Sequence, residues 1–285
     1  MIIFFVGTGR LGNQLFQLNG IEYFTRHIKK RNFILFNMPE IIQALNLHPC
    51  YKVINNKHFV KFYDKILKYI LYFFYKLRII GSLNCKYSYI YNIKYEYTYS
   101  LQLGILPIIW IPTLYFQKAN LAHTFPFSIQ HQHIQNALTF IDNLPPFRNY
   151  IYIHIRKTDY KTYTVLGKTG ADLPLSYFRR AIQWFIQNIE NPYFIFLTDD
   201  REFVEDNFSD ISEKSVSNLD QYGDLALMSL CEYGIISNSS FSWWGSYFMK
   251  NRKKVIAPRY WLGFKSEMEY PPGIIAPWME TIDVD

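Results

Sequence analysis

The second half of the chain alternates short apolar runs with segments of helical period, and this alternation restricts its fold more than any other feature. Residues 150–156, 193–198 and 254–257 are rich in β-branched and aromatic residues, as buried strands are. Pro174 opens a segment in which apolar residues recur every three or four positions, as in a helix. Further helices are predicted at 224–233 and 241–250, with a strand at 235–237. Strands that alternate with helices form a parallel, doubly wound sheet, so we predict an α/β domain.

The first half begins in the same way and then becomes less regular. Its first predicted elements are a strand, a helix and a second strand, at 2–6, 13–27 and 33–36. Pro145 and Pro146 stop regular structure, and we take them as the limit between an N-terminal domain, 1–146, and a C-terminal domain, 147–285. With 285 residues, 49% of them apolar, the chain is long enough for two domains with cores of their own.

Residues 66–80 form an aromatic segment of helical period that carries Lys68, Lys76 and Arg78. Two interpretations stay open: a basic amphipathic helix on an anionic membrane surface, or a core helix with a solvated basic edge. We weigh the core helix slightly higher. The apolar start of the chain is too short for a signal peptide, and the uncharged stretch 97–117 is broken by glycine and proline, so buried strands with turns explain it better than a membrane span.

The net charge of the chain indicates which classes of partner it could bind, and its cysteines indicate the redox compartment. Lysine and arginine number 30 against 23 acidic residues, and the net charge of +7 favours anionic partners: nucleic acid, a lipid surface or a small phosphorylated substrate. Cys50, Cys85 and Cys231 share no C-x-x-C spacing, so neither a zinc site nor a disulfide framework is indicated, and a reducing compartment fits best.

Polar residues follow three of the predicted strands at the point where each strand ends. His154 and Arg156 end the first, Asp199 and Asp200 follow the second, and residues 238–240 follow the third. Ligands of open α/β sheets bind outside the carboxyl ends of the strands, so we predict a site there. Loops are polar in any protein, but a histidine and an arginine in an otherwise apolar strand are costly to bury without a partner.

Arg156 offers a planar fork suited to phosphate, and Lys157 adds a second positive charge beside it. Ser239 and Ser240 precede a helix, whose free N–H groups can bind phosphate, although a simple N-cap supplied by Ser240 would explain these residues equally well. No Asp-x-Asp pair lies near these strand ends. Asp199 and Asp200 could hold a metal, but adjacent carboxylates on a turn are more often a helix cap and a solvated charge. A diphosphate site that needs no metal is therefore predicted.

Gly7, Gly9 and Gly12 fit the dinucleotide-binding pattern G-x-G-x-x-G between a strand and a helix. That pattern also requires an acidic residue at the end of the second strand, where this chain has Asn37. An NAD-dependent oxidoreductase that uses this loop stays an alternative, and a non-catalytic carbohydrate-binding protein is another. The missing acid argues against the first and the cationic strand end against the second.

Three longer motifs carry a resemblance to a known family. They are Gly-Arg-Leu-Gly-Asn-Gln-Leu-Phe-Gln at 9–17, His-Ile-Arg-Lys-Thr-Asp-Tyr at 154–160 and Ile-Ile-Ser-Asn-Ser-Ser-Phe-Ser-Trp-Trp at 235–244. Shorter matches lie at 115–117, 198–200, 227–229 and 258–261. With these motifs the chain resembles the α-1,2-fucosyltransferases of glycosyltransferase family 11 over nearly its whole length, most weakly between about residues 40 and 110.

The resemblance implies a GT-B fold: two Rossmann-like domains facing a cleft, with the acceptor on the N-terminal side and GDP-fucose in the C-terminal domain. It implies an inverting transfer of L-fucose to the 2-hydroxyl of a galactosyl acceptor, in surface polysaccharide synthesis, without a metal or a cofactor. The acceptor would be a glycan, lipid-linked by analogy, and nucleic acid would not be a partner. A cytoplasmic enzyme in peripheral contact with the inner membrane face fits this role.

The resemblance also implies roles for single residues. Arg156 would neutralise the departing diphosphate, with His154 and Asp159 shaping that pocket and serving as candidate bases. The donor would be bound by Arg10, Gly12, Asn13, Lys157, Tyr160, Asp199, Asn238, Ser239, Ser240 and Phe241. This chain departs from the usual His-x-Arg-Arg-Gly-Asp-Tyr at two positions: Lys157 replaces an arginine and loses its fork, and Thr158 replaces a glycine that is more permissive.

Overall fold

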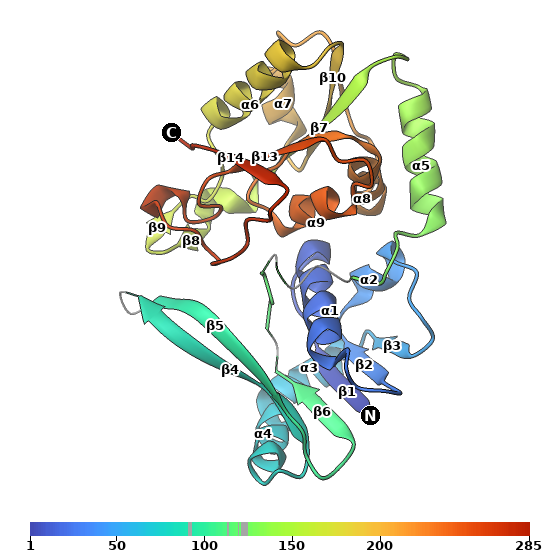
Figure 1. The fold of residues 1–285 in the computed structure, drawn as a ribbon, viewed down its shortest axis with the longest axis vertical. Coiled ribbons are helices and arrows are strands. Elements are labelled where there is room, and N and C mark those ends of the chain that lie inside the picture. Colours follow the sequence, from blue (N-terminus) through green and yellow to red (C-terminus); the bar gives the residue numbers. More distant parts are fainter. Residues whose placement is uncertain (91–92, 113, 119, 121–124) are drawn as a thin grey trace. The chain divides into compact units, whose positions relative to one another are not determined.

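Two α/β units make up the chain in a computed structural model, which describes residues 1–90, 93–112, 114–118, 120 and 125–285 (Figure 1). The first compact unit is Met1–Ser128 and the second is Ile129–Asp285. Each unit contains one sheet of six strands, which is mostly parallel in the first unit and wholly parallel in the second. The prediction of an α/β fold in both halves is therefore confirmed.

The second unit contains the strands and helices that the sequence predicts, with small shifts at their ends. Its strands are β7 (Asn149–Ile155), β8 (Thr164–Val165), β9 (Lys168–Thr169), β10 (Pro192–Thr198), β11 (Lys214–Val216), β12 (Tyr233–Ile235), β13 (Lys254–Pro258) and β14 (Met279–Ile282). Its helices are α5 (His131–Asp142), α6 (Leu175–Asn188), α7 (Arg201–Asn207), α8 (Gln221–Leu230) and α9 (Ser240–Phe248), with 3₁₀ turns η3 (Asp159–Thr162) and η4 (Phe264–Ser266).

The sheet of this unit has the strand order β11-β10-β7-β12-β13-β14, and all its strand pairs are parallel. The chain first adds strands on one side of β7 and then crosses to the other, so the strand order reverses at β7. Ile151, Ile153 and Ile155 of β7 pack into the core that α6 covers with Phe178 and Phe185. This buried framework fixes where the end of β7 lies.

Helix α5 belongs to the second unit, where it packs against α8. The ring of His133 in α5 lies 5.2 Å from the ring of Tyr222 in α8. The limit that the sequence suggested, 146/147, therefore falls one helix and a short loop after the division between the compact units, 128/129. As the limit between an acceptor-side and a donor-side domain, 146/147 stays a prediction.

The first unit has the strand order β3-β2-β1-β6-β4-β5, in which only β5 runs antiparallel to its neighbour. Its strands are β1 (Ile2–Val6), β2 (Asn32–Phe36), β3 (Tyr51–Ile54), β4 (Gly81–Ile90), β5 (Ile93–Gln102) and β6 (Ile108–Ile111). Its helices are α1 (Leu11–Thr25), α2 (Pro39–Ala44), α3 (Lys57–Phe62) and α4 (Lys68–Lys76), with a π-helical turn, η1 (Tyr63–Leu67), joining the last two.

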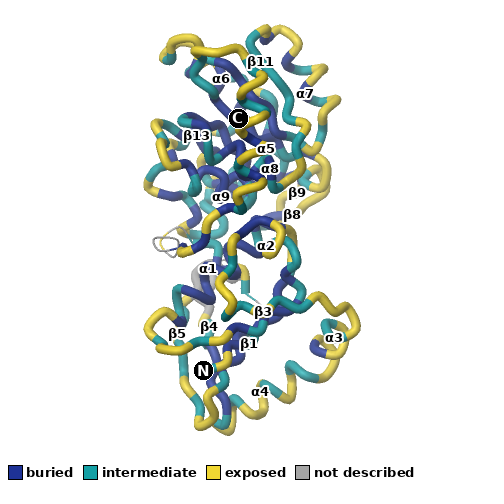
Figure 2. Tube along the Cα trace, turned by 90° about the vertical axis from the view of Figure 1, so that its right-hand side faces the viewer, coloured by how far each residue is buried: buried dark blue, intermediate teal, exposed yellow. Residues whose placement is uncertain are grey.

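The core-helix interpretation of residues 66–80 is wrong for α4. No residue of α3 or α4 is buried, and in η1 only Tyr63 is. Figure 2 shows this segment as largely exposed tube. The stretch after β5 is also exposed at Leu103, Ile105 and Leu106, whereas β6 is buried as predicted. Among the described residues no helix is both long and apolar enough to cross a membrane.

Candidate functional site

The predicted polar clusters meet at the carboxyl ends of three neighbouring strands, β10, β7 and β12. Strand β7 lies between the other two, with Thr198 beside Ile155 and Ile235 beside Ile153. Because the strand order reverses at β7, this edge is the switch point of the sheet, where ligands of doubly wound folds bind. This strand pairing places the three predicted polar clusters at one edge of the sheet.

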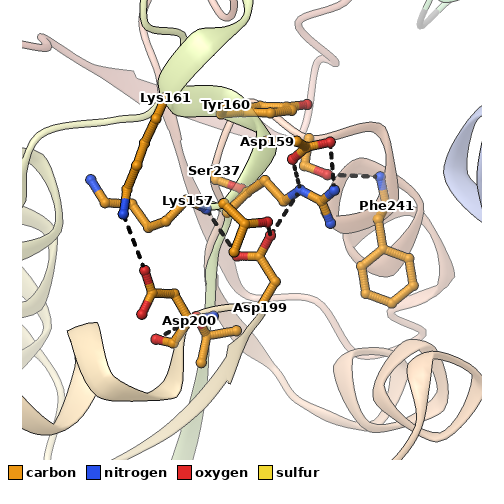
Figure 3. Close-up of polar contacts among 12 residues, drawn as sticks. Lys157, Asp159, Tyr160, Lys161, Asp199, Asp200, Ser237 and Phe241 are labelled. Atoms are coloured by element: carbon orange, nitrogen blue, oxygen red, sulfur yellow. Dashed lines mark hydrogen bonds and ion pairs between the residues drawn. The ribbon is translucent and has the colours of Figure 1, made fainter.

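Two carboxylates hold the guanidinium of Arg156. Asp159 accepts two parallel hydrogen bonds of 2.8 Å, from Nε and Nη2, and an oxygen of Asp199 lies 3.1 Å from Nε (Figure 3). Although burial opposes the charge, the bonds to Asp159 and the nearby carboxylates raise the pKa of Arg156. Nη1 has no hydrogen-bond partner among the described residues, so a fixed cation offers one open edge to an anion.

Asp199 holds the turn that follows β7 in addition to holding Arg156. Its carboxylate accepts a 2.9 Å bond from the backbone N–H of Lys157 and a 2.6 Å bond from Oγ1 of Thr158. Thr158 has φ −53°, which any residue adopts, so the replacement of the usual glycine causes no strain. Its hydroxyl adds a bond that glycine could not make. Asp199 is thus a positioning residue in this structure.

Lys157 points away from the guanidinium, which differs from the expected phosphate clamp. Its ammonium lies 2.9 Å from Asp172 and donates a 2.9 Å bond to the carbonyl of Leu173. The same nitrogen sits 4.5 Å from the centre of the Phe203 ring, and the residue is only 6% exposed. The expectation that Lys157 adds a second charge beside Arg156 is therefore not supported, because its ammonium is already engaged elsewhere.

His154 is buried at the base of the site and is uncharged at neutral pH. Its Nδ1 lies 2.8 Å from Oγ of Ser237, and its ring lies 5.4 Å from that of Phe241. Burial, and then the positive charge of Arg156, lower the pKa of His154 to about 3. A group with such a pKa accepts a proton poorly at neutral pH, so this environment disfavours His154 as a general base.

Residues 238–240 form a tight loop that leads into α9. Nδ2 of Asn238 donates a 2.8 Å bond to the carbonyl of Ala171, while its buried Oδ1 has no hydrogen-bond partner in the described part of the chain. Ser239 caps α9, since its hydroxyl accepts a bond from the N–H of Phe241. The cap expected at Ser240 therefore lies one residue earlier, and Ser240 is the first residue of the helix. A helix N-terminus with a cap still attracts an anion through its partial positive charge.

Tyr160 contacts both Arg156, which follows β7, and the loop that follows β12. Its ring lies 5.7 Å from the guanidinium carbon of Arg156, and its hydroxyl donates a 3.4 Å bond to the carbonyl of Asn238. Burial raises the pKa of Tyr160 to about 12, so the phenol stays a hydrogen-bond donor. The turn after β7 and the loop after β12 are therefore linked through one residue.

The carboxylates of this site are used for hydrogen bonds and ion pairs rather than gathered for a cation. Asp200 caps α7 through the N–H of Phe203 and pairs with Lys161 at 3.5 Å. The single Asp-x-Asp pair of the sequence, Asp283 and Asp285, is paired with arginines of its own unit. Across the described residues, no three histidine, cysteine or acidic side chains cluster as metal ligands would. The expected independence from metal stays a prediction.

The glycine loop of the first unit is held by amide side chains. Gln14 donates a 2.9 Å bond to the carbonyl of Gly9, and Gln17 accepts a bond from the N–H of Thr8. Asn37, where a dinucleotide site needs an acid, donates a 3.0 Å bond to the carbonyl of Gly7. The position that would bind the ribose of a dinucleotide is therefore occupied by an amide side chain that bonds the glycine loop.

The three predicted donor-binding residues of the first unit lie at the start of α1. Arg10 is exposed at the N-cap position, Gly12 is buried in the first turn, and Oδ1 of Asn13 accepts a 2.9 Å bond from Gln117. Their role toward a donor stays a prediction. Two further residues, Ser237 and Asp172, are the partners of His154 and Lys157 and were not predicted. Ser237 lies within the motif at 235–244, but no spacing pairs it with His154, and Asp172 lies in no motif.

Comparisons with known proteins agree with the fold and with the family resemblance. The family model described as Glycosyl transferase family 11 matches residues 115–269, which include all of the second unit's candidate residues. The chain is 26% identical to the O-antigen biosynthesis glycosyltransferase WbnK of Escherichia coli, over 89% of this chain and 93% of WbnK. It is 32% identical to an α-1,2-colitosyltransferase of Escherichia coli, over 40% of this chain and 41% of that protein.

A solved structure shows the same architecture. The α-1,6-fucosyltransferase NodZ of Bradyrhizobium, in crystals soaked with GDP-fucose, matches with a TM-score of 0.53 at 10% sequence identity, over 89% of this chain and 94% of that one. At this identity the likeness concerns the fold. Both units are α/β domains with parallel sheets, as in a GT-B-like protein, and the predicted fold class is confirmed.

Proposed function

The chain belongs to glycosyl transferase family 11, and from this premise we propose that it transfers L-fucose from GDP-fucose to the 2-hydroxyl of a galactosyl acceptor, with inversion and without a metal. The colitosyltransferase relative is named for the same 1,2 linkage. The name of the O-antigen relative supports an acceptor among the glycans of a bacterial surface polysaccharide. We expect this acceptor to be lipid-linked and the enzyme to act at the inner membrane face.

One observation carries the proposal: a held guanidinium, a buried amide oxygen and a helix N-terminus occur together at the switch point of the second sheet. Arg156 keeps Nη1 open while Asp159 and Asp199 hold its other edges. In a single displacement the acceptor oxygen attacks the anomeric carbon, and the bond to the diphosphate breaks. Negative charge then grows on the diphosphate, and a preorganised cation stabilises that charge at no cost of reorganisation.

Asp159 is the better candidate for the general base, because burial keeps His154 neutral and weakly basic. The side chain of Asp159 is 52% exposed, and both of its carboxylate oxygens bond Arg156. While the diphosphate binds the open Nη1 and Asp159 keeps its bonds to Nε and Nη2, we assign to the exposed carboxylate of Asp159 the proton of the acceptor hydroxyl. A base of this kind contributes about 10²–10⁴ in rate.

The two alternative functions have less support. An NAD-linked enzyme requires an acid at the position of Asn37, whose side chain instead bonds Gly7. A binding protein without catalysis has no need of an arginine fixed by two carboxylates at a switch point.

A ligand panel separates the three candidate functions. A ligand that binds only the folded protein raises its stability by about 2.7 kcal/mol at a hundredfold excess over Kd, so melting temperatures report binding. We expect GDP and GDP-fucose to raise the melting temperature of the full chain, and UDP and NAD to leave it unchanged. A shift with NAD alone would support the oxidoreductase, and a shift with free glycans but no nucleotide would support the binding protein; either result contradicts the proposal.

A further inference from the structure

The segment α3–η1–α4 carries two apolar stripes, and only the inner one is covered. The inner stripe, with Tyr63, Leu67 and Leu71, packs against Val6 and Phe36 of the first unit's sheet. The outer stripe is exposed and recurs every three or four residues, as one face of a helix does: Phe62, Ile66, Tyr69, Ile70, Phe73 and Leu77. A surface helix of a monomeric protein normally presents polar residues on this side.

A second piece of chain extends the outer stripe. The turn after β5 is fixed beside the end of α4 by two bonds, from the N–H of Ile105 to the carbonyl of Arg78 and from the N–H of Leu106 to the carbonyl of Ile79. A Cβ on Gly104 would lie 2.3 Å from the carbonyl carbon of Ile80, so glycine is required for this approach. Figure 1 shows α4 and this turn side by side. Ile105 is 83% exposed.

We call this surface the docking face: the outer stripe of α3–η1–α4 together with the turn of Leu103, Ile105 and Leu106. Basic residues border it. Between residues 57 and 80 they are Lys57, Lys61, Lys65, Lys68, Lys76 and Arg78, against the single acid Asp64. The ammonium groups of Lys68 and Lys76 lie 5.2 and 5.1 Å from the ring centres of Tyr69 and Tyr72, so charge and aromatic surface meet at the edge.

The charge pattern decides which partner fits. In a two-fold dimer the same patch meets itself, which would set these lysines against one another. An anionic bilayer instead offers acyl chains to the apolar stripe and negative headgroups to the lysines. Aromatic side chains with flanking lysines are typical of helices that lie in the membrane interface.

We propose that the docking face binds the first unit peripherally to an anionic lipid bilayer, with Phe73 and Ile105 among the apolar side chains that enter it. Each basic residue near an anionic surface adds to the attraction between protein and bilayer, and salt screens that attraction. The proposal rests on the first unit alone and does not depend on the proposed function.

Cosedimentation with vesicles tests the proposal on the full chain. We expect binding to phosphatidylcholine vesicles that contain roughly a third phosphatidylglycerol, and little binding to pure phosphatidylcholine. Raising the ionic strength from about 0.1 M to about 1 M shortens the Debye length from about 10 Å to about 3 Å and should release the protein. No binding to the anionic vesicles at low salt would overturn the proposal.

Two variants, each with a matched control, separate the contribution of the basic residues to membrane binding from that of the apolar residues. Lys61→Glu/Lys65→Glu/Lys76→Glu should lower the partition coefficient at least about tenfold. Its matched control, Lys29→Glu/Lys168→Glu/Lys250→Glu, changes the net charge equally with exposed lysines outside the docking face and should bind as the original does. Phe73→Ser/Ile105→Ser should also lose binding, whereas Phe147→Ser, at a residue that is 95% exposed elsewhere, should not.

Folding and self-association are checked in the same samples. Circular dichroism and transfer to a free acceptor should be unchanged in every variant, which separates loss of membrane binding from loss of structure or of the proposed activity. An equal loss in the lysine control would mean that net charge alone drives binding, and an equal loss in Phe147→Ser would mean that any exposed apolar residue does; either result would overturn the proposal. A dimer that the Phe73→Ser/Ile105→Ser variant dissociates would assign the docking face to a second copy instead, and would also overturn it.

Discussion

Arg156→Ala is expected to lower kcat by about 10²–10³, corresponding to about 2.7–4 kcal/mol of lost transition-state stabilisation, while GDP affinity falls much less. The reason is geometric. Asp159 and Asp199 hold the guanidinium before any ligand arrives, so its open edge interacts best with the charge that develops on the leaving diphosphate. Arg156→Lys should restore only part of the rate, because an ammonium cannot bond both carboxylates and the diphosphate in a fixed plane.

The measurement is kcat and KM for GDP-fucose together with the Kd of GDP. Arg179→Ala is the matched control, since Arg179 makes a similar bidentate pair with Asp210 in the same unit but outside the site. A variant Arg156→Ala that keeps kcat and only raises KM would assign uniform binding to this arginine, and the catalytic role would then pass to another group.

Lys157→Met is expected to show the opposite behaviour: a loss of about 3 kcal/mol in the free energy of unfolding, with kcat changed little in the folded protein. Removing the ammonium breaks a buried pair with Asp172 and leaves the carbonyl of Leu173 without its partner. The Asp172 side chain keeps 23% exposure, so water can compensate part of the loss, and the expected value lies at the low end for buried pairs.

Urea unfolding and initial rates measure this second prediction. Lys161→Met is the matched control: the side chain of Lys161 is 58% exposed, its ammonium lies 3.5 Å from Asp200, and such surface pairs contribute about 0–1 kcal/mol. If Lys157→Met instead lowers kcat strongly and leaves stability intact, Lys157 binds phosphate after all, and the side chain must turn toward the diphosphate when the donor binds.

The contrast between Arg156 and Lys157 shows what sequence patterns could and could not reveal. The strand before them was predictable because its residues are apolar and β-branched, and the position of Arg156 at the ligand edge followed from that strand. In the structure the turn after β7 sends the two side chains to different partners, Asp159 for Arg156 and Asp172 for Lys157, so the two cations do not form one clamp. The partner of Lys157, Asp172, lies in a loop, and no periodicity predicts where a loop folds back.

Helix α4 illustrates the other limit. Its residues are apolar nearly all round, which in a sequence indicates a buried helix. Burial, however, depends on which neighbours the rest of the chain supplies, and here the first unit supplies neighbours on one side only. In the same way, the proline pair at 145–146 indicated a break, while the packing of α5 on α8 decided which compact unit this helix joins.

The transfer reaction itself tests the central claim most directly. The full chain is incubated with GDP-fucose, a galactoside acceptor and excess EDTA, and the product linkage is determined by NMR together with the amount of GDP released. The account predicts fucose in α linkage on the 2-hydroxyl, one GDP per linkage formed, and a rate that EDTA does not change. GDP release without transfer, a β-linked product, or a rate that collapses in EDTA and returns with Mg²⁺ would contradict it.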